Sequence, residues 1–381
     1  MIKYKLKFGS LAVATCLMFG LVASANAIVY TSSNEISGNR VIVFDIKNSS
    51  GNLKEIGSFD TQGTGTGAPL GNQGALVTDA GDRYLFVTNA GDGSVTSLRL
   101  QPEGLEFVNK VPSGGHSAIS VTVFGTLVYV LNEGSGLDSD PPKLRYDNIS
   151  GFRFNSVGEL VPLANSTRII DDTQLTAPAQ VGFNNAGSVL LITEKATNTL
   201  TTYVVQEDGT PAADPLKRPS AVPTPFGFQF GDRDFVFITE ANQGGPGSTV
   251  SYRVDRGTGE VSPLVGRVDQ GNATCWTALS SDQTIGYSVN TGSDTVSLYR
   301  INFDGTLKRF SNSRYRRYRN ANEIFTGTAP RDAVLTQNNQ FFYTLNNGDG
   351  RIRAFRVRRN GSLRRRGTVS VPTSVTGIIA R

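Results

Sequence analysis

Cysteine and histidine are nearly absent from this chain of 381 residues, which has two cysteines and one histidine. Cys16 lies in an N-terminal apolar run, so Cys275 is the single cysteine in the rest of the chain, and an intrachain disulfide is excluded there. The lone histidine, His116, cannot build a multi-histidine metal site, and no Ser-His-Asp arrangement is legible around it. We therefore expect no metal and no cofactor, and we expect stability to come from packing.

Long apolar runs are also scarce, and the one clear example begins the chain. Lys3, Lys5 and Lys7 precede an apolar stretch that ends at the small residues 25–27. This order is typical of a signal peptide, and we expect cleavage after Ala27 and a secreted or periplasmic protein. The stretch is shorter than the roughly 20 residues of a spanning helix, so no transmembrane segment is predicted. Lipidation of Cys16 is disfavoured because the apolar run continues past it.

A strong excess of one charge is missing as well. Without the three leader lysines, 34 basic residues face 32 acidic ones, which leaves a net charge of +2. That balance argues against nucleic acid or an anionic membrane as a partner. Residues 308–319 and 351–366 nevertheless hold 14 of the 34 cations. They form either a solvated rim or a docking surface for an anionic glycan or the cell envelope, assisted by Tyr315 and Tyr318.

One pattern recurs at a spacing of roughly 50 residues. Each copy has an apolar run, a turn rich in Asn, Gly and Asp, and a second run in which apolar and polar residues alternate. The seven apolar runs occupy residues 28–32, 84–89, 127–132, 190–194, 235–240, 285–290 and 341–346. The alternating runs occupy residues 40–46, 94–100, 148–154, 199–205, 249–254, 295–301 and 351–357. Their β-branched and aromatic content predicts strands, and no helical period competes.

Four short antiparallel strands repeated seven times are typical of a β-propeller. An inner strand is covered on both faces by neighbouring blades and is therefore apolar throughout, whereas an outer strand alternates. We predict an all-β fold, a seven-bladed β-propeller with four-stranded antiparallel blades. We expect a single domain over residues 28–381, and a monomer.

The two ends of the chain indicate how the ring closes. Residues 28–32 have a second-strand pattern with no first strand before them. Residues 371–381 resemble the first strands of other blades, such as residues 176–183. We therefore predict that the C-terminal strand completes the first blade, which leaves no open strand edge.

In a propeller, the loops that leave second strands and enter first strands meet at one mouth of the central channel, and such loops often carry function. The residues that end the second strands are predicted to form a ring there: Ser32, Asn89, Asn132, Glu194, Glu240, Asn290 and Asn346. The starts of the first strands supply a companion set: His116, Gln180, Phe226, Trp276 and Arg331. Acids, amides, a guanidinium and aromatic walls around one pocket are typical of a ligand site.

Glu194 and Glu240 end strands of adjacent blades, where like charges would raise the pKa of one carboxyl group and suit it to acid/base catalysis. We take both, with His116, as candidate catalytic residues. The candidate ligand-binding residues are Gln180, Lys195, Phe226, Trp276, Arg331, Asn132 and Asn290. Structural interpretations compete with these roles: the glutamates cap turns or form ion pairs, His116 lies on a surface loop, and Trp276 packs in the core.

Two kinds of loop invite ion or phosphate binding. Turns such as residues 89–92 and 346–349 contain the Asn, Gly and Asp of calcium loops, but turn chemistry alone explains those residues. The glycine-rich residues 63–74 precede no helix and lack the lysine of a phosphate-binding loop. We therefore favour plain turns and loops at these places.

Five segments resemble the lactonase-type seven-bladed propeller family, which includes propeller-type 6-phosphogluconolactonase and carboxymuconate lactonising enzyme. They are PAQVGF (178–183), LITEKATN (191–198), TPFGF (224–228), ATCW (273–276) and APRDAVL (329–335). The resemblance covers nearly the whole chain after the leader and implies the propeller fold. It also implies lactonase or cycloisomerase chemistry with an arginine, a histidine and a glutamate at the channel mouth.

The family residues are only partly present. Glu194 matches the glutamate, whereas Ala179 and Gln180 occupy the arginine and histidine positions. His116 is the candidate for a separate family histidine, and Arg331 follows a proline in a different blade. The cation that would stabilise a lactone oxyanion is therefore missing from its family position.

Two hypotheses of function follow. The first is a secreted lactonase-like propeller that binds a small polar or cyclic metabolite at the channel mouth and hydrolyses or forms a lactone by carboxylate acid/base catalysis. The alternative is a non-catalytic secreted propeller that binds envelope glycans or a protein through its rim. The alternative predicts binding that weakens with salt and with neutralisation of Arg314, Arg316, Arg317 and Arg319.

Overall fold

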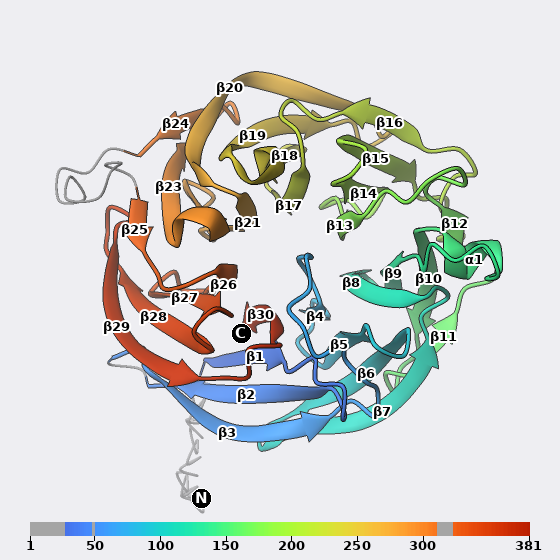
Figure 1. The fold of residues 1–381 in the computed structure, drawn as a ribbon, viewed down its shortest axis with the longest axis horizontal. Coiled ribbons are helices and arrows are strands. Elements are labelled where there is room, and N and C mark those ends of the chain that lie inside the picture. The colour runs from blue at the N-terminus through green and yellow to red at the C-terminus, as the bar shows by residue number, and fades with distance from the viewer. Residues whose placement is uncertain (1–26, 48–49, 311–322) are drawn as a thin grey trace, which may run out of the picture.

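The computed structural model describes residues 27–47, 50–310 and 323–381. Seven antiparallel sheets stand around a central axis like the blades of a propeller (Figure 1). The predicted all-β, seven-bladed fold is thereby confirmed. The predicted leader and the cluster Arg314, Tyr315, Arg316, Arg317, Tyr318 and Arg319 lie outside the described residues.

The two inner strands of each blade follow the predicted pattern. The first strands, which surround the axis, are in ring order β30 (Thr376–Ala380), β4 (Leu76–Thr78), β8 (Ser117–Phe124), β13 (Pro178–Phe183), β17 (Pro225–Phe230), β21 (Thr274–Leu279) and β26 (Pro330–Leu335). The second strands are β1 (Ile28–Ser32), β5 (Tyr84–Asn89), β9 (Leu127–Glu133), β14 (Val189–Glu194), β18 (Phe235–Glu240), β22 (Ile285–Asn290) and β27 (Phe341–Asn346). We number the blades 1 to 7 in this order. The second strands are buried almost throughout, as their apolar sequences predict.

The third strands are largely buried, and the fourth strands form the exposed rim of the ring. The third strands are β2 (Arg40–Ile46), β6 (Ser94–Gln101), β10 (Asn148–Phe154), β15 (Thr199–Val204), β19 (Pro246–Val254), β23 (Thr295–Ile301) and β28 (Arg351–Val357). The fourth strands are β3 (Leu53–Asp60), β7 (Gly104–Pro112), β11 (Leu160–Pro162) with β12 (Arg168–Ile169), β16 (Leu216–Pro219), β20 (Val261–Asn272), β24 (Leu307–Arg309) with β25 (Glu323–Phe325), and β29 (Leu363–Ser370). In blades 3 and 6 the fourth strand is interrupted, and both pieces pair with the same third strand.

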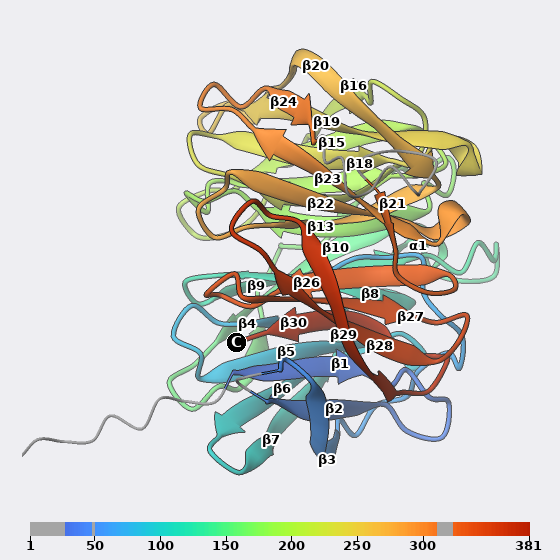
Figure 2. The same ribbon diagram turned by 90° about the vertical axis from the view of Figure 1, so that its left-hand side faces the viewer.

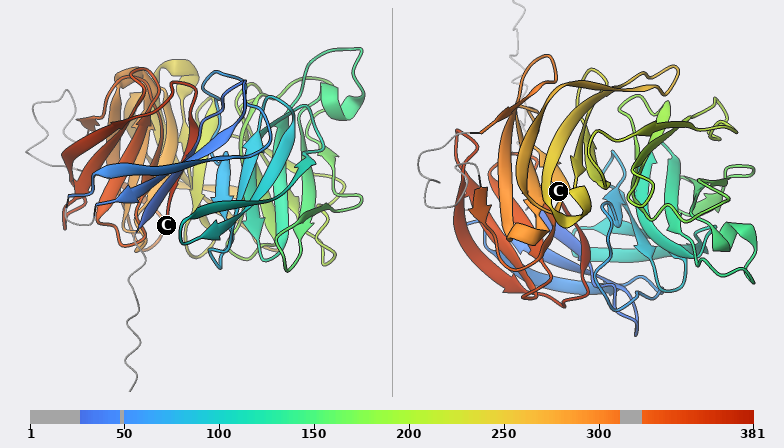
Figure 3. Two further views of the ribbon diagram at one scale, coloured as in Figure 1. Left: turned by 90° about the horizontal axis from the view of Figure 1, so that it is seen from below. Right: turned by 45° about the horizontal axis from the view of Figure 1, so that its top comes forward.

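Helical structure is limited to short turns in the described chain. They are α1 (Pro142–Arg145), η1 (Asn242–Gly244) and η2 (Thr291–Ser293). The connection that carries α1 joins β9 to β10 and projects from the disc (Figure 3). None of the helices in the described residues is long and apolar enough to cross a membrane.

The ring closes between the two ends of the described chain, as predicted. β30 pairs antiparallel with β1, from Val29 opposite Ala380 to Ser32 opposite Thr376. Figure 2 shows the two strands side by side. Blade 1 therefore combines residues from both ends of the sequence, in the order β3-β2-β1-β30.

Neighbouring blades are joined by buried tyrosines on the second strands. The hydroxyl groups of Tyr129, Tyr287 and Tyr343 donate to the carbonyl oxygens of Gly209, Gly361 and Gly51, at 2.7, 2.8 and 2.9 Å. Each acceptor lies in a turn of the next blade around the ring. The aromatic ring of each tyrosine packs in the core, and its hydroxyl group makes a directional hydrogen bond. Each tyrosine therefore links two blades by both apolar packing and hydrogen bonding.

Candidate functional site

The first strands begin irregularly at one mouth of the channel. β13, β17, β21 and β26 each carry a register shift near the first residue. The residues before them, Ala177, Thr224, Ala273 and Ala329, all have positive φ. Bulges re-aim side chains, and positive φ is costly for residues other than glycine. The mouth is therefore built from strained backbone that aims each strand's first side chains.

The ring of residues that end the second strands is present, but its side chains point into the blades. All seven members are buried. Asn89 donates to Thr96 Oγ1 at 2.9 Å, and Asn290 donates to Ser297 Oγ at 2.8 Å. Asn132 accepts a hydrogen bond from Ser113 Oγ at 2.6 Å and donates to Asn148 Oδ1 at 3.0 Å. These side chains bind the second strand to the third strand and its loops.

Glu194 occupies this same position in blade 4. One carboxylate oxygen accepts a hydrogen bond from Thr201 Oγ1 and the other accepts one from Thr197 Oγ1 at 2.5 Å. Burial raises the pKa of Glu194, and the two hydroxyl groups partly offset that rise. Thr201 stands seven residues after Glu194, as Thr96 follows Asn89 and Ser297 follows Asn290, so the geometry gives Glu194 a structural role like theirs.

Glu240 is the corresponding residue of blade 5 and is also fully buried. Its Oε1 accepts hydrogen bonds from Tyr252 Oη at 2.5 Å and from the backbone nitrogen of Ala221 at 3.2 Å. Its Oε2 has no partner among the described residues. Burial raises the pKa of Glu240 to about 7, against the lowering effect of the Tyr252 hydroxyl. The structure does not bring Glu240 and Glu194 to a common pocket.

Successive side chains on a strand point to opposite faces of the sheet, so the residue after each ring position points away from the side that the ring residue faces. Lys195, which follows Glu194, shows this plainly. Its Nζ donates to the carbonyl oxygens of Gly71 at 2.6 Å and Pro178 at 3.0 Å. The ammonium group also lies 5.3 Å from the centre of the Phe226 ring, within cation–π range. Burial lowers the pKa of Lys195.

Phe226 and Trp276 form an aromatic pair beside Lys195. Their ring centres are 4.8 Å apart and the rings are inclined by 60°. Trp276 is 2% exposed, and its Nε1 donates to the carbonyl oxygen of Asn72 at 2.7 Å. Trp276 therefore packs in the core, while Phe226 lies between it and the lysine.

Further titratable groups lie around Lys195. Glu133, the residue after Asn132, is half-buried, and burial raises its pKa against the opposing effects of Lys195 and His116. His116 is exposed in the loop before β8. Arg331 is half-buried on β26 and acts electrostatically on Cys275, as Lys195 does. Lys195 contacts Phe226 and acts electrostatically on Glu133, as His116 does, and we call these four residues the Lys195 cluster. The side chains of Asn132 and Asn290 are instead buried and bonded within their blades.

A segment of the loop between blades 1 and 2 occupies the channel at this mouth. We call residues 70–74 the channel segment; Figure 1 shows it reaching the axis ahead of β4. Gln73 donates to the carbonyl oxygens of Ala179 and Thr277, and Gly74 accepts from Val121. Asn72 is bonded to the first strands of blades 1, 3 and 6. The segment therefore ties four first strands together and closes this end of the channel.

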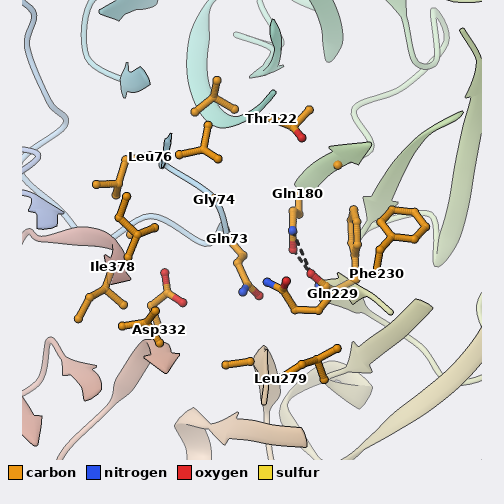
Figure 4. Close-up of a pocket in the computed structure, with 18 of the residues that line it drawn as sticks. Gln73, Gly74, Leu76, Thr122, Gln180, Gln229, Phe230, Leu279, Asp332 and Ile378 are labelled. Atoms are coloured by element: carbon orange, nitrogen blue, oxygen red, sulfur yellow. Dashed lines mark hydrogen bonds between the residues drawn. The ribbon is translucent and has the colours of Figure 1, made fainter. Parts of the chain in front are cut away.

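Beyond the channel segment the centre of the ring is hollow, with a volume of about 390 Å³. All seven first strands line this central cavity, which reaches exposed Asn185 where β13 ends. Gln180 lies in its wall, with its amide bonded to the backbone nitrogen and oxygen of Phe228 at 2.8 and 3.1 Å (Figure 4). Asp332 is the single ionisable residue of the lining. The cavity opens on the face opposite the Lys195 cluster.

Three of these residues were not singled out from the sequence. Glu133 and Lys195 hold equivalent positions, one residue after the ring, and applying the two-residue alternation at the strand end would have found Glu133. Asp332 stands in APRDAVL as the one acid in a first strand of the ring, which is itself a signal. Gln73 lies in a glycine-rich loop that carries no sign of its path through the channel.

Comparisons with known proteins agree with this fold. Residues 21–139 match the family model described as lactonase, 7-bladed beta-propeller. A search of curated proteins finds no match. Among solved structures the chain is similar to the periplasmic gluconolactonase of Pseudomonas aeruginosa, with a TM-score of 0.70, 18% identity, and coverage of 92% of this chain and 98% of that chain.

Two further solved structures show the same likeness. A Bacteroides fragilis protein provisionally assigned as a 6-phosphogluconolactonase has a TM-score of 0.73, 15% identity, and coverage of 95% of this chain and 99% of that chain. A Lactobacillus plantarum protein has a TM-score of 0.72, 17% identity, and coverage of 93% and 99%. Identities this low show the fold alone. With the family match over residues 21–139, they confirm that the chain resembles the lactonase-type seven-bladed β-propeller family.

Proposed function

We propose that this protein binds a small cyclic polar molecule of the lactone class at the mouth where the first strands begin, and hydrolyses it. The observation that carries the proposal is the position of Lys195. Its ammonium group bonds to the carbonyl oxygen of Pro178, directly beside Ala179, where the family has its arginine. A lysine from the second strand thus supplies a cation at the place where the family cation is missing.

The hydrogen bonds of Lys195 leave it able to act on a ligand. An ammonium group has three donors, and two of them are used by Gly71 and Pro178. The third can donate to the carbonyl oxygen of a lactone and stabilise the negative charge that develops there during attack. The half-buried position of Lys195 strengthens this effect, because charges interact more strongly where water is partly excluded.

Glu133 is suited to activate the attacking water. Its side chain makes no hydrogen bond to another described residue, and burial raises its pKa, which makes the carboxylate a stronger base. The carboxylate would take a proton as the water oxygen attacks the lactone carbon. It would then return that proton to the ring oxygen as the ester bond breaks, which yields the hydroxy acid.

The acids first selected from the sequence give a competing assignment. Glu194 matches the family glutamate, but its two oxygens are bonded to threonine hydroxyl groups inside blade 4. Glu240 is enclosed in blade 5. We assign both to the fold and Glu133 to the chemistry, with His116 at the exposed edge of the cluster. The N-terminal leader pattern supports a secreted or periplasmic location for this activity.

Hydrolysis of a lactone panel that includes glucono-1,5-lactone, followed by proton release, tests this assignment. Lys195→Met should lower kcat/KM by about 100-fold to 1,000-fold, as loss of an oxyanion donor does. Glu133→Gln should lower kcat by about 100-fold or more. Exposed Lys54→Met is the matched control and should keep the parent rate.

The same assay distinguishes the competing acids. Glu194→Gln and Glu240→Gln should retain the parent rate if both residues serve the fold. A 100-fold loss of kcat in Glu194→Gln alone would mean that Glu194, and not Glu133, is the catalytic carboxylate. Failure of the parent protein to open any lactone of the panel would contradict the hydrolysis that we propose.

A second candidate function rests on the outer strands of blade 7. Their exposed arginines are Arg351, Arg356, Arg358, Arg359, Arg364 and Arg365. Arg356 lies directly opposite Arg364 across β28 and β29, a pairing of like charges that is unfavourable without an anion. None of the six forms a salt bridge to another described residue. The arrangement favours an anionic glycan or envelope surface as partner.

Binding to dextran sulfate, with neutral dextran as reference, tests the second candidate. The Arg356→Gln/Arg364→Gln double variant should bind more weakly, and the parent's affinity should fall as salt rises. A double variant on another blade, Arg83→Gln/Arg99→Gln, makes the same change in net charge. Equal loss in both double variants would mean that net charge acts and that blade 7 is not a docking surface.

A further inference from the structure

The central cavity is separate from the Lys195 cluster and has its own chemistry. The channel segment lies between them, and Gln73 forms part of the cavity wall. Most of the residues that line it have apolar side chains, with Leu76, Leu279, Leu335, Ile378 and Phe228 among them, but polar atoms make up about half of the cavity surface. A cavity of about 390 Å³ is within the range of small-molecule sites.

Asp332 is the one charged or titratable side chain of the lining. It is 3% exposed, and Figure 4 shows it on the cavity wall facing Gln73 and Gln229. Its Oδ1 accepts a hydrogen bond from the backbone nitrogen of Ala333 at 2.8 Å, and the backbone of Ile378 also bonds to it. No salt bridge joins it to a basic residue of the described chain. A buried carboxylate without a counter-charge is costly, so Asp332 either stays in its neutral form or pairs with a cation that enters the cavity.

The other polar side chains of the cavity differ in whether their hydrogen-bonding groups are free to bind a ligand. The amides of Gln73 and Gln180 are already bonded to the backbones of Thr277 and Phe228. The amide of Gln229 points toward the cavity in Figure 4 and has no hydrogen bond to another described residue. A ligand therefore meets one carboxyl group, one amide with unused hydrogen bonds, mainly apolar side chains, and polar atoms that are already bonded within the wall.

This set of groups selects the charge of the ligand. No lysine, arginine or histidine lines the cavity, so an anion would meet no compensating charge. In the described residues no three histidine, cysteine or acidic side chains come together to hold a metal ion. A single carboxylate beside mainly apolar side chains fits a small organic ammonium ion better than it fits a metal.

We propose that the central cavity is a second binding site, which takes a small organic cation whose ammonium group pairs with Asp332 while its carbon part packs on the apolar wall. The site does not depend on lactone chemistry at the opposite mouth. It opens on the other face of the ring, where the first strands end, so its ligand can enter without moving the channel segment.

The protonation of Asp332 gives the site a pH dependence. Burial raises the pKa of Asp332 to about 8, and the backbone nitrogens of Ala333 and Ile378 offset only part of that rise. The elements packed on β26 bring few titratable side chains: Cys275 on β21, Tyr287 on β22, Tyr343 on β27 and Arg331 on β26 itself. None of them is a cause of the shift. Asp332 is therefore mostly protonated at neutral pH, and a bound cation would drive its proton into solvent.

The proton release predicts how affinity changes with pH. Below pH 8 the free cavity must lose a proton before it can pair with the cation, whereas above pH 8 it has already done so. Affinity for a permanently protonated amine should therefore rise roughly 90-fold between pH 6 and pH 9. An aspartate with an ordinary pKa near 4 would give no change over that range.

Calorimetric titration with cyclohexylammonium chloride from pH 6 to pH 9 tests the proposal, with cyclohexanol and cyclohexanecarboxylate as neutral and anionic probes. The parent should bind the cation alone and release a proton at pH 7. Asp332→Asn should abolish both effects. Asp304→Asn, in an exposed turn, is the matched control and should behave as the parent.

Asn can accept the same backbone hydrogen bond as Asp332, so Asp332→Asn should fold, and thermal melting checks that it does. The proposal is overturned if the alcohol or the carboxylate binds as well as the ammonium ion. It is equally overturned if Asp332→Asn keeps the affinity of the parent, or if the parent binds no cation at pH 9.

Discussion

Glu240→Gln should change how the stability of the ring depends on pH. Glu240 is fully enclosed in blade 5, and its Oε2 has no hydrogen-bond partner among the described residues. A glutamine has the same shape, and its Oε1 can accept the same hydrogen bonds from Tyr252 and Ala221. The substitution therefore removes the ionisation of the side chain and keeps its main contacts.

The size of the effect follows from the pKa of Glu240 in the two states. That pKa is about 7 in the folded protein, because burial penalises the charged form, and about 4.3 in an unfolded chain. The folded pKa is the higher one, so the protonated form stabilises the fold fully below about pH 4, and that stabilisation is lost as pH rises through 7. Between pH 5 and pH 8.5 the parent should lose about 2.5 kcal/mol relative to Glu240→Gln.

Urea denaturation of both proteins at pH 5 and pH 8.5 measures this difference. Asp332 and Glu194 are present in both proteins, so their own pH dependence cancels. Exposed Glu260→Gln provides the control and should show no difference in relative stability between the two pH values. A stability difference between parent and Glu240→Gln that is equal at both pH values would refute the buried, unpaired carboxyl group on which the reasoning rests.

Two further predictions concern the packing of the blades and the closure of the propeller ring. Gly305→Ala places a Cβ 2.7 Å from the Phe235 ring at a φ of +82°, whereas Gly125→Ala has a φ of +58° and no atom within 4 Å of its Cβ. Gly305→Ala should therefore lower the free energy of unfolding by about 1 to 3 kcal/mol more than Gly125→Ala. Equal melting temperatures of the two variants would contradict this. Removal of residues 372–381 should expose the edge of β1 and cause self-association, which a synthetic peptide of residues 372–381 should reverse. If the truncated protein is monomeric in size-exclusion chromatography, β30 is not needed to close the ring.

The fold could be predicted from the sequence because a propeller repeats one local rule seven times. The apolar runs at residues 84–89 and 341–346 are both buried second strands, and the alternating runs after them are third strands. The pattern of the two chain ends also predicted the pairing of β30 with β1. Each of these predictions needed only periodicity and the burial that follows from it.

The candidate site could be predicted less completely from the sequence, because it depends on where side chains point and on the path of one irregular loop. Glu194 was identified at the end of a second strand, but its direction into the blade depends on the pleat, and Lys195 one residue later points the other way. The path of Gln73 through the channel depends on long-range hydrogen bonds to blades 4 and 6. Sequence periodicity has no information about such contacts, so neither the closed mouth nor the cavity beyond it was predicted.

A crystal soaked with glucono-δ-lactam, which resembles the lactone but resists hydrolysis, would test the central claim most directly. The account predicts the lactam at the mouth where the first strands begin, with its carbonyl oxygen about 2.7 to 3.2 Å from Lys195 Nζ and its ring near Phe226. Density for the lactam in the central cavity, or its carbonyl oxygen bound away from Lys195, would contradict the claim that this lysine supplies the missing cation.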